Sequence, residues 1–156
     1  MAALAAIRLR GQMRLNSDIA DTMRSLRLTR ANHCVILPVN EQTTGQLRHA
    51  KDYITFGTVE AKAIADLLRA RGRLEGDAPL TDAVVAKSTP FKTIDELAQA
   101  LADGKVKYWE IPGIKPIFRL SPPRGGHKGG LKRSFQVHGG LGNRGDKMAD
   151  LIARMI

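Results

Sequence analysis

The sequence has one cysteine, few aromatic residues and no apolar run long enough to span a membrane. Cys34 is the single cysteine among 156 residues, so an intrachain disulfide is excluded and a reducing, cytoplasmic compartment is the simplest expectation. Aromatic residues make up 4% of the chain, so its core must consist mainly of Leu, Ile, Val and Ala. No apolar run approaches the roughly 18 residues of a membrane helix, and we therefore expect no membrane partner.

Acidic residues are also scarce relative to basic ones. The chain has 25 Lys and Arg against 15 Asp and Glu, a net charge of +10. The excess is uneven, because residues 1–59 carry +4, residues 60–114 carry −1 and residues 115–156 carry +7. This balance favours a polyanionic partner, with nucleic acid ahead of an acidic membrane surface. The two basic regions could form one surface if the fold brings them together.

Hydrophobic periodicity predicts an alternation of strands and helices followed by a more helical segment. The expected strands are residues 4–9, 33–39, 53–59 and 115–120, and the expected helices are residues 17–28, 44–52, 59–71, 81–88, 92–104 and 143–156. Asn16 suits the start of the first helix, and Thr43 or Thr44 the start of the second. We expect three segments: a core over 1–72, a mostly helical insertion over 73–114, and a basic loop with a C-terminal helix over 115–156.

Two motifs that could indicate a cofactor or a metal do not hold up. Residues 140–145, GLGNRG, match the G-x-G-x-x-G pattern, but the chain ends eleven residues later and leaves no room for the second strand that a dinucleotide site needs. A glycine-rich turn into the last helix explains the pattern better. Cys34 and the four histidines show no paired metal-ligand spacing. We therefore expect no cofactor and no metal.

An enzymatic function has little support in the sequence. Cys34 and a histidine could in principle form a nucleophilic pair, but no oxyanion-hole motif or orienting partner accompanies them. Cys34 is better explained as a small buried apolar residue. An RNA-processing enzyme that uses Cys34 or the histidines stays a minor alternative.

The stretch SPPRGGHKGGLKRSF, residues 121–135, has four glycines, five basic or potentially basic residues and no acid. Only Leu131 and Phe135 suit a core. Glycines let a backbone approach phosphates closely, basic side chains neutralise them, and histidines can stack on unpaired bases. Because the stretch is bounded by a predicted strand and a predicted helix, we interpret it as an RNA-binding loop that orders mainly on binding. A free RNA chaperone or regulator is the alternative within this class.

Four stretches together resemble a known family: DTMRSLRLTRANHCVILP, GQLRHAKDYITFG, FRLSPPRGGHKGGLKRSF and HGGLGNRGDKMADLI. They follow the same order along the whole chain as in the L30 family of large-subunit ribosomal proteins, in its longer archaeal form, whose eukaryotic counterpart is L7. Gln46 and Phe56 depart mildly from the family pattern, which has methionine and tryptophan there.

The resemblance implies a ferredoxin-like α+β core of strand-helix-strand-helix-strand, a helical insertion, and a basic glycine-rich extension that ends in a helix. It implies a non-catalytic structural protein of the cytoplasmic ribosome that is not a homo-oligomer. Its partners would be large-subunit ribosomal RNA, near where the small ribosomal RNA of that subunit meets the large one, and neighbouring ribosomal proteins. The RNA contacts that the resemblance implies are Arg27, Arg30, Asn32, His33, Gly45, Arg48, Lys51, Tyr53 and Thr55. The basic extension adds Arg124, Gly125, His127, Lys128, Lys132, Arg133, His138 and Arg144.

Overall fold

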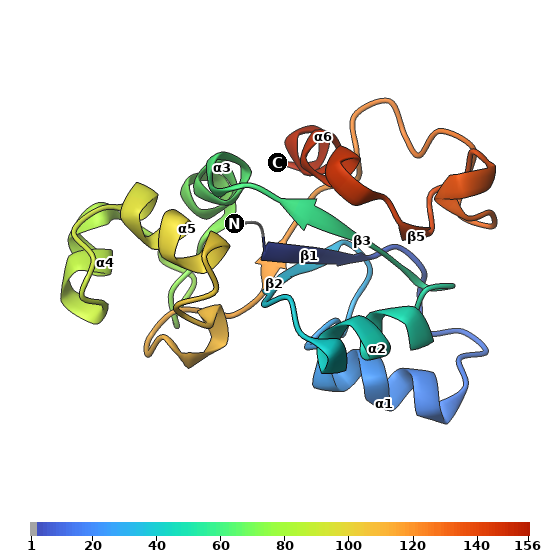
Figure 1. The fold of residues 1–156 in the computed structure, drawn as a ribbon, viewed down its shortest axis with the longest axis horizontal. Coiled ribbons are helices and arrows are strands. Elements are labelled where there is room, and N and C mark those ends of the chain that lie inside the picture. Colours follow the sequence, from blue (N-terminus) through green and yellow to red (C-terminus); the bar gives the residue numbers. More distant parts are fainter. Residues whose placement is uncertain (1–2) are drawn as a thin grey trace.

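The computed structural model describes residues 3–156, which form a mixed sheet between two layers of helices (Figure 1). The strands are β1 (Ala3–Arg8), β2 (His33–Leu37), β3 (Ile54–Val59), β4 (Phe118–Arg119) and β5 (Gly142–Asn143). The α-helices are α1 (Ser17–Ser25), α2 (Glu41–His49), α3 (Ala61–Arg71), α4 (Asp82–Ser88), α5 (Ile94–Ala102) and α6 (Met148–Met155). Short 3₁₀ turns are η1 (Tyr108–Glu110), η2 (Phe135–Val137) and η3 (Gly145–Lys147).

The sheet has the order β4-β2-β1-β3-β5, with β1 at its centre. β1 is antiparallel to both β2 and β3, β4 is antiparallel to β2, and β5 is parallel to β3. The expected α+β fold with a strand-helix-strand-helix-strand core is confirmed. Among residues 3–156, no helix is long and apolar enough to cross a bilayer.

Both faces of the sheet are buried, and the alternation of side chains along β1 shows why. Ala5 and Ile7 belong to one apolar cluster together with residues of α3, α5 and α6, whereas Ala6 belongs to a second cluster with residues of α1 and α2. Successive side chains of a strand point to opposite faces, so a strand covered on both sides must be apolar throughout. In Figure 1, α1 and α2 accordingly lie on one side of the sheet and α3 and α6 on the other.

The caps of the first two helices combine one confirmed prediction with one error. Asn16 is the N-cap of α1, and its side chain accepts a hydrogen bond from the backbone N–H of Asp18. Helix α2, in contrast, begins at Glu41 with Asn40 as its N-cap, so neither Thr43 nor Thr44 caps it. The Thr43 hydroxyl sits inside the first turn, where it accepts from the Asn40 N–H at 3.1 Å. The prediction started α2 one turn too late because Thr43 completes the cap instead of forming it.

Gly57 allows the C-terminal segment to pack closely on the sheet. A Cβ atom at this position in β3 would lie 2.3 Å from the carbonyl oxygen of Gly145 and 2.9 Å from Cβ of Met148. A residue without a side chain is therefore needed where η3 and the start of α6 cross β3. This contact brings residues 142–156 against the strand that follows α2.

Residues 73–114 extend the molecule at the end opposite the glycine-rich segment (Figure 1). Leu97 and Leu101 of α5 are buried in the same cluster as Ile64 and Leu68 of α3. The Tyr108 ring stacks on Phe118 of β4 with centroids 5.0 Å apart. The segment is thus packed against the sheet and α3 through apolar contacts.

Candidate nucleic-acid interface

Three chain segments meet at the end of the sheet where β1 finishes. The backbone N–H of Leu9 donates to the carbonyl of Tyr53 at 3.0 Å, which joins the end of β1 to the start of β3. The N–H of Asn32 donates to Arg8 at 2.7 Å, and the N–H of Leu120 donates to Asn32 at 3.1 Å. The turn before β2, the turn before β3 and the start of the glycine-rich segment are therefore neighbours. We call this end of the molecule the basic end; it consists of the turn before β2, the turn before β3 and the glycine-rich segment that follows β4.

A buried arginine, Arg8, holds the turn between α1 and β2 through hydrogen bonds to its backbone carbonyls. Arg8 is 2% exposed, and its guanidinium donates to the carbonyls of Leu28 and Thr29 at 2.9 and 3.0 Å. Burial lowers the pKa of Arg8. Because Arg8 holds the turn carbonyls inward, the side chains of Arg27 and Arg30 are left exposed to solvent.

The same turn contains two residues with left-handed backbone. Arg27 has φ 61° and Asn32 has φ 65°, values that are unfavourable for arginine and tolerated by asparagine. His33, the first residue of β2, is half-buried, and its Nδ1 lies 3.3 Å from the Thr29 hydroxyl. Burial, then the charges of Arg119 and other arginines, lowers the pKa of His33. A neutral imidazole can donate or accept a hydrogen bond beside these cations.

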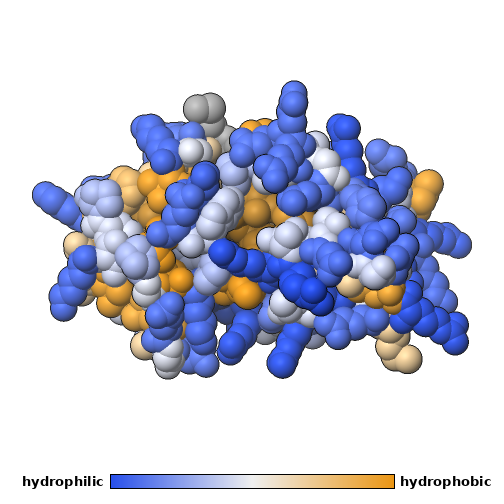
Figure 2. Space-filling view, turned by 90° about the horizontal axis from the view of Figure 1, so that it is seen from below, coloured by the Kyte–Doolittle hydropathy of each residue, from blue (hydrophilic) through white to orange (hydrophobic). Residues whose placement is uncertain are grey.

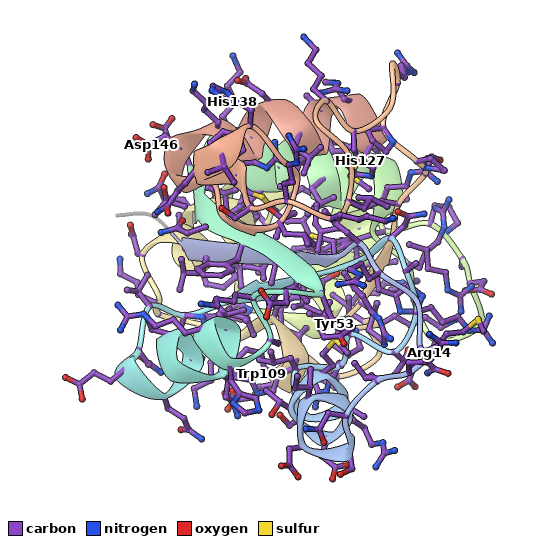
Figure 3. All side chains as sticks on the ribbon, turned by 90° about the vertical axis from the view of Figure 1, so that its right-hand side faces the viewer. Arg14, Tyr53, Trp109, His127, His138 and Asp146 are labelled. Atoms are coloured by element: carbon purple, nitrogen blue, oxygen red, sulfur yellow. The ribbon has the colours of Figure 1, made fainter. Side chains whose placement is uncertain are left out.

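The second group of expected contacts lies on α2 and the turn that follows it. Gly45, Arg48 and Lys51 are exposed. Tyr53 is half-buried, with the guanidinium carbon of Arg10 4.9 Å from its ring centroid. Figure 3 looks onto this end and shows Tyr53 between α1 below and the glycine-rich segment above.

The side chain of Thr55 is buried and therefore not accessible to a partner. Its side chain is 0% exposed, and its hydroxyl donates to the carbonyl of Gly142 at 3.1 Å. It thereby ties β3 to β5. The expectation that Thr55 faces RNA is corrected on this ground: its side chain orders the sheet edge from which the glycine-rich segment returns.

The glycine-rich segment, residues 121–141, is folded on itself and is not an open loop. The N–H of Arg124 donates to the carbonyl of Arg154 in α6 at 2.9 Å, and the Arg154 guanidinium donates back to the Arg124 carbonyl at 2.9 and 3.0 Å. Leu131 is partly buried against the main cluster. The structure thus differs from the expectation of order mainly on binding, because α6 provides backbone partners that the local composition did not reveal.

Two parts of this segment approach so closely that only glycine fits. A Cβ atom on Gly129 would lie 1.5 Å from the carbonyl oxygen of His138. Gly129 also has φ +80°, in the left-handed region. Its neighbour Gly130 has φ +79° and no atom within 4 Å of the same position. Of these two glycines, only Gly129 is therefore required by a close backbone approach, whereas both are favoured by the left-handed φ angle.

Arg144 also supports the segment from within. Its guanidinium donates to the carbonyl of Gly140 at 3.0 Å and to the Thr55 hydroxyl at 3.3 Å, and it lies 4.6 Å from the ring centroid of Phe135. Burial, then the charge of Arg154, lowers the pKa of Arg144. Arg144 was expected to contact RNA, but its donors are largely turned toward the protein.

Behind the exposed basic side chains lies a cavity of 510 Å³ without an acidic lining residue among those the structure describes. Its basic lining residues are His127, Lys128, His138, Arg144, Lys147 and Arg154. Figure 3 shows His127 and His138 on the same side of the sheet, in the glycine-rich segment. Burial, then the charges of Arg144 and Arg154, lowers the pKa of His127. An anion placed here would find several cations and no competing carboxylate.

The charges of the basic end are not neutralised within the protein. Ion pairs among the described residues join Arg24 to Asp21, Arg69 to Asp95, Lys105 to Asp103, Lys107 to Glu110, and both Lys115 and Arg119 to Asp77. Apart from the first pair, all lie in or beside residues 60–119. In the described part of the chain, residues 120–156 take part in no ion pair. The positive charges of residues 120–156 are therefore not compensated by ion pairs within the described structure.

Three basic residues with clear roles here were not singled out from the sequence: Arg8, Arg10 and Arg154. Arg8 and Arg10 are two apart at the end of a strand, so they share a side of it, but that pattern does not distinguish a buried arginine from an exposed one. Arg154 is a helix residue with no local signal for the carbonyls it binds 28 to 30 residues earlier. Such contacts depend on tertiary structure.

An α+β fold with an uncompensated cationic end defines a class of proteins suited to bind polyanions. Residues 4–54 match the family model for ribosomal protein L30p/L7e. The large ribosomal subunit protein uL30 of Methanocella arvoryzae is 46% identical over 151 residues, 97% of this chain and 98% of the relative. Those of Methanoculleus marisnigri and Methanopyrus kandleri are 44% and 43% identical, over 97% and 95% of this chain and 98% and 100% of their own lengths. The chain belongs to the L30p/L7e family of ribosomal proteins, as its sequence motifs indicated.

Proposed function

We propose that the chain is a structural constituent of the large ribosomal subunit that binds ribosomal RNA through its basic end. The observation that carries the proposal is the absence of ion pairs in the described residues from 120 to 156, although this segment has seven basic and two acidic residues and so carries half of the net charge of +10. Each lysine or arginine that neutralises a phosphate releases condensed counterions, and this release drives binding. The large-subunit names of the relatives support the assignment.

The direct contacts fall into two groups on either side of the sheet end. One consists of Arg27, Arg30, Asn32, His33, Gly45, Arg48, Lys51 and Tyr53, and the other of Arg124, Gly125, His127, Lys128, Lys132, Arg133 and His138. Thr55 and Arg144 act behind them by fixing the segment that carries the second group. Residues 1–72 form the core, residues 73–114 an insertion and residues 115–156 the basic extension in this proposal.

A structural role without catalysis agrees with the chemistry available. Cys34 is 0% exposed, and burial raises the pKa of its thiol, so it has little thiolate character at neutral pH. In the part of the chain that the structure describes, no three His, Cys, Asp or Glu side chains gather as metal ligands would. Neighbouring ribosomal proteins and the small ribosomal RNA of the large subunit are the further proposed partners, in the cytoplasm.

Cosedimentation tests the proposal against the alternative of a free RNA chaperone or regulator. The tagged protein is expressed in cells, and their lysate is sedimented. The protein should sediment with large subunits at moderate salt and dissociate from them only at high salt. Recovery solely in the ribosome-free fraction would contradict the structural role. RNA-processing activity that disappears in Cys34→Ala would contradict the absence of catalysis.

A further inference from the structure

A groove on the α1 and α2 side of the sheet is not accounted for by the contacts described above. It has a volume of 360 Å³ and lies between the end of α1, the start of α2 and the 3₁₀ turn η1 of residues 73–114. Val35 and Leu37 of β2 contribute apolar surface to it. Figure 2 views this side of the molecule, where apolar surface shows at the bottom of a hollow between strongly hydrophilic side chains.

One wall of the groove is the ring of Trp109. This residue and its neighbour Tyr108 pack on opposite sides of the sheet, because Tyr108 is buried in the cluster under α3 while Trp109 packs partly buried against the cluster under α1 and α2. Figure 3 shows Trp109 on the α1 and α2 side. Its indole N–H has no acceptor among the hydrogen bonds of residues 3–156. The Nζ atom of Lys107 lies 6.0 Å from the centroid of the indole ring. The groove thus offers an aromatic surface beside a mobile cation, and an unused donor.

The rim of the groove is polar and cationic. Its main polar lining residues are Arg27, Asn40, Gln42, Gln46 and Lys107. Lys107 pairs with the exposed Glu110 at 3.0 Å, whereas Arg27 has no ion-pair partner in the described structure. Of the described residues that line the groove, none is acidic. Side-chain amides donate and accept hydrogen bonds at once, which suits the edge of a nucleobase.

We propose that this groove takes one unpaired RNA base. The base stacks against Trp109, the amide side chains bond its edge, and Arg27 contacts the adjoining phosphate. An aromatic wall, edge-reading amides and a free cation are the combination by which proteins hold single-stranded RNA. The groove is continuous with the basic end through Arg27, and the inference therefore rests on the proposed RNA-binding function.

Trp109 is the only tryptophan in the chain, so its fluorescence reports on this groove alone. The intact protein is titrated with short oligoadenylate or oligouridylate, and separately with a fully paired RNA duplex of the same length. Stacking quenches tryptophan emission, so the single strands should quench Trp109. The duplex supplies phosphates but no free base, and it should bind without comparable quenching.

Two variants and a control test the contacts. Because neither Trp109 variant retains tryptophan fluorescence, their affinities are measured with labelled RNA. Trp109→Ala should weaken single-strand binding about 5- to 150-fold, as expected for the loss of one stacked base, while Trp109→Phe keeps most of the affinity. Because Trp109→Ala could also loosen the fold, Arg27→Asn is made with Trp109 intact. Asparagine tolerates the left-handed backbone of residue 27, so the guanidinium is removed without added backbone strain. Arg24→Gln, an exposed arginine of α1 outside the groove, is the matched control and should leave the quenching unchanged.

The outcomes separate this inference from the function on which it rests. Quenching by single strands only, weakened in Arg27→Asn and not in Arg24→Gln, supports the base site. Salt-dependent RNA binding without quenching, and with full affinity in Trp109→Ala, overturns the base site and leaves RNA binding by the basic end intact. A Trp109 signal that changes with ribosomal proteins but not with RNA overturns it in favour of a protein contact. Failure of every RNA to bind refutes both proposals.

Discussion

The neighbouring glycines 129 and 130 provide a matched test of whether the glycine-rich segment is folded before RNA binds. Their φ angles are +80° and +79°, so alanine at either position carries the same backbone strain. They differ in what a side chain would meet, since Cβ at Gly129 lies 1.5 Å from the His138 carbonyl oxygen and Cβ at Gly130 lies in open space. Any difference between Gly129→Ala and Gly130→Ala therefore measures the close contact within the segment.

The magnitudes follow from these two terms. The left-handed conformation costs an alanine about 1–2 kcal/mol, and about 0.4–1 kcal/mol returns because alanine restricts the unfolded chain. Gly130→Ala should thus destabilise the segment by roughly 1 kcal/mol. In Gly129→Ala the two backbone stretches must also separate by about 1.9 Å to bring this 1.5 Å approach to an ordinary contact of 3.4 Å. Overpacking of this kind adds about 1–3 kcal/mol.

Hydrogen exchange of the free protein is the suitable assay, because the damage should stay local. Amides of residues 121–141 should lose protection in Gly129→Ala, while those of β1 and β3 keep it. Gly130→Ala should show a much smaller loss. Equal behaviour of the two variants, or no protection of the segment in the unaltered protein, would refute the claim that it is folded without RNA.

Three further changes test the supporting contacts. Arg8→Met removes the buried donor of the α1–β2 turn, and urea unfolding should show a loss of about 2–4 kcal/mol, since the lost charged hydrogen bonds exceed the relief of desolvation; a loss below about 1 kcal/mol would contradict this. Tyr108→Phe deletes a buried hydroxyl that has no partner within residues 3–156, so the Tm should hold or rise, and a clear fall would count against the assignment. Burial, then Arg144 and Arg154, lowers the pKa of His127 from 6.5. The unfolded segment therefore binds the proton more readily than the folded one. The contribution of His127 to the stability of the segment is fully present above pH 6.5 and is lost as the pH falls below 6.5. Protease cleavage of residues 121–141 should accelerate on acidification, less so in His127→Gln, and a pH-independent rate would argue against the mechanism.

The order of the main elements could be predicted because each has a local cause. The apolar run of β2 and the stripe of Met148, Leu151, Ile152 and Met155 on α6 identify a strand and a helix from spacing alone. The start of α2 was missed because two threonines competed with Asn40 for the cap. β4 lies within the strand predicted for residues 115–120, although only Phe118 and Arg119 belong to the strand. β5 was not predicted, because a strand of two residues is defined by its pairing with β3, which the local sequence does not encode.

The candidate site divides in the same way. The charge excess and the glycine content of residues 121–135 are local and indicated a polyanion partner. Whether a given polar residue faces outward is not local. Thr55 is buried because β5 returns beside β3, and Arg144 turns inward because Phe135 and Gly140 lie within its reach. The local sequence does not indicate that Trp109 lines a groove, because residues of α1, α2 and the turns beside them form its other wall.

The salt dependence of ribosomal RNA binding tests the central claim most directly. Arg124, Lys128, Lys132 and Arg133 are exposed, without ion pairs in the described structure, and are changed together to alanine. Each phosphate contact adds roughly 0.7 to 1 to the slope of log affinity against log salt, so the slope for large-subunit ribosomal RNA should fall by about 3 to 4 while the core stays folded. An unchanged affinity and an unchanged slope in a folded variant would contradict RNA binding by the basic end.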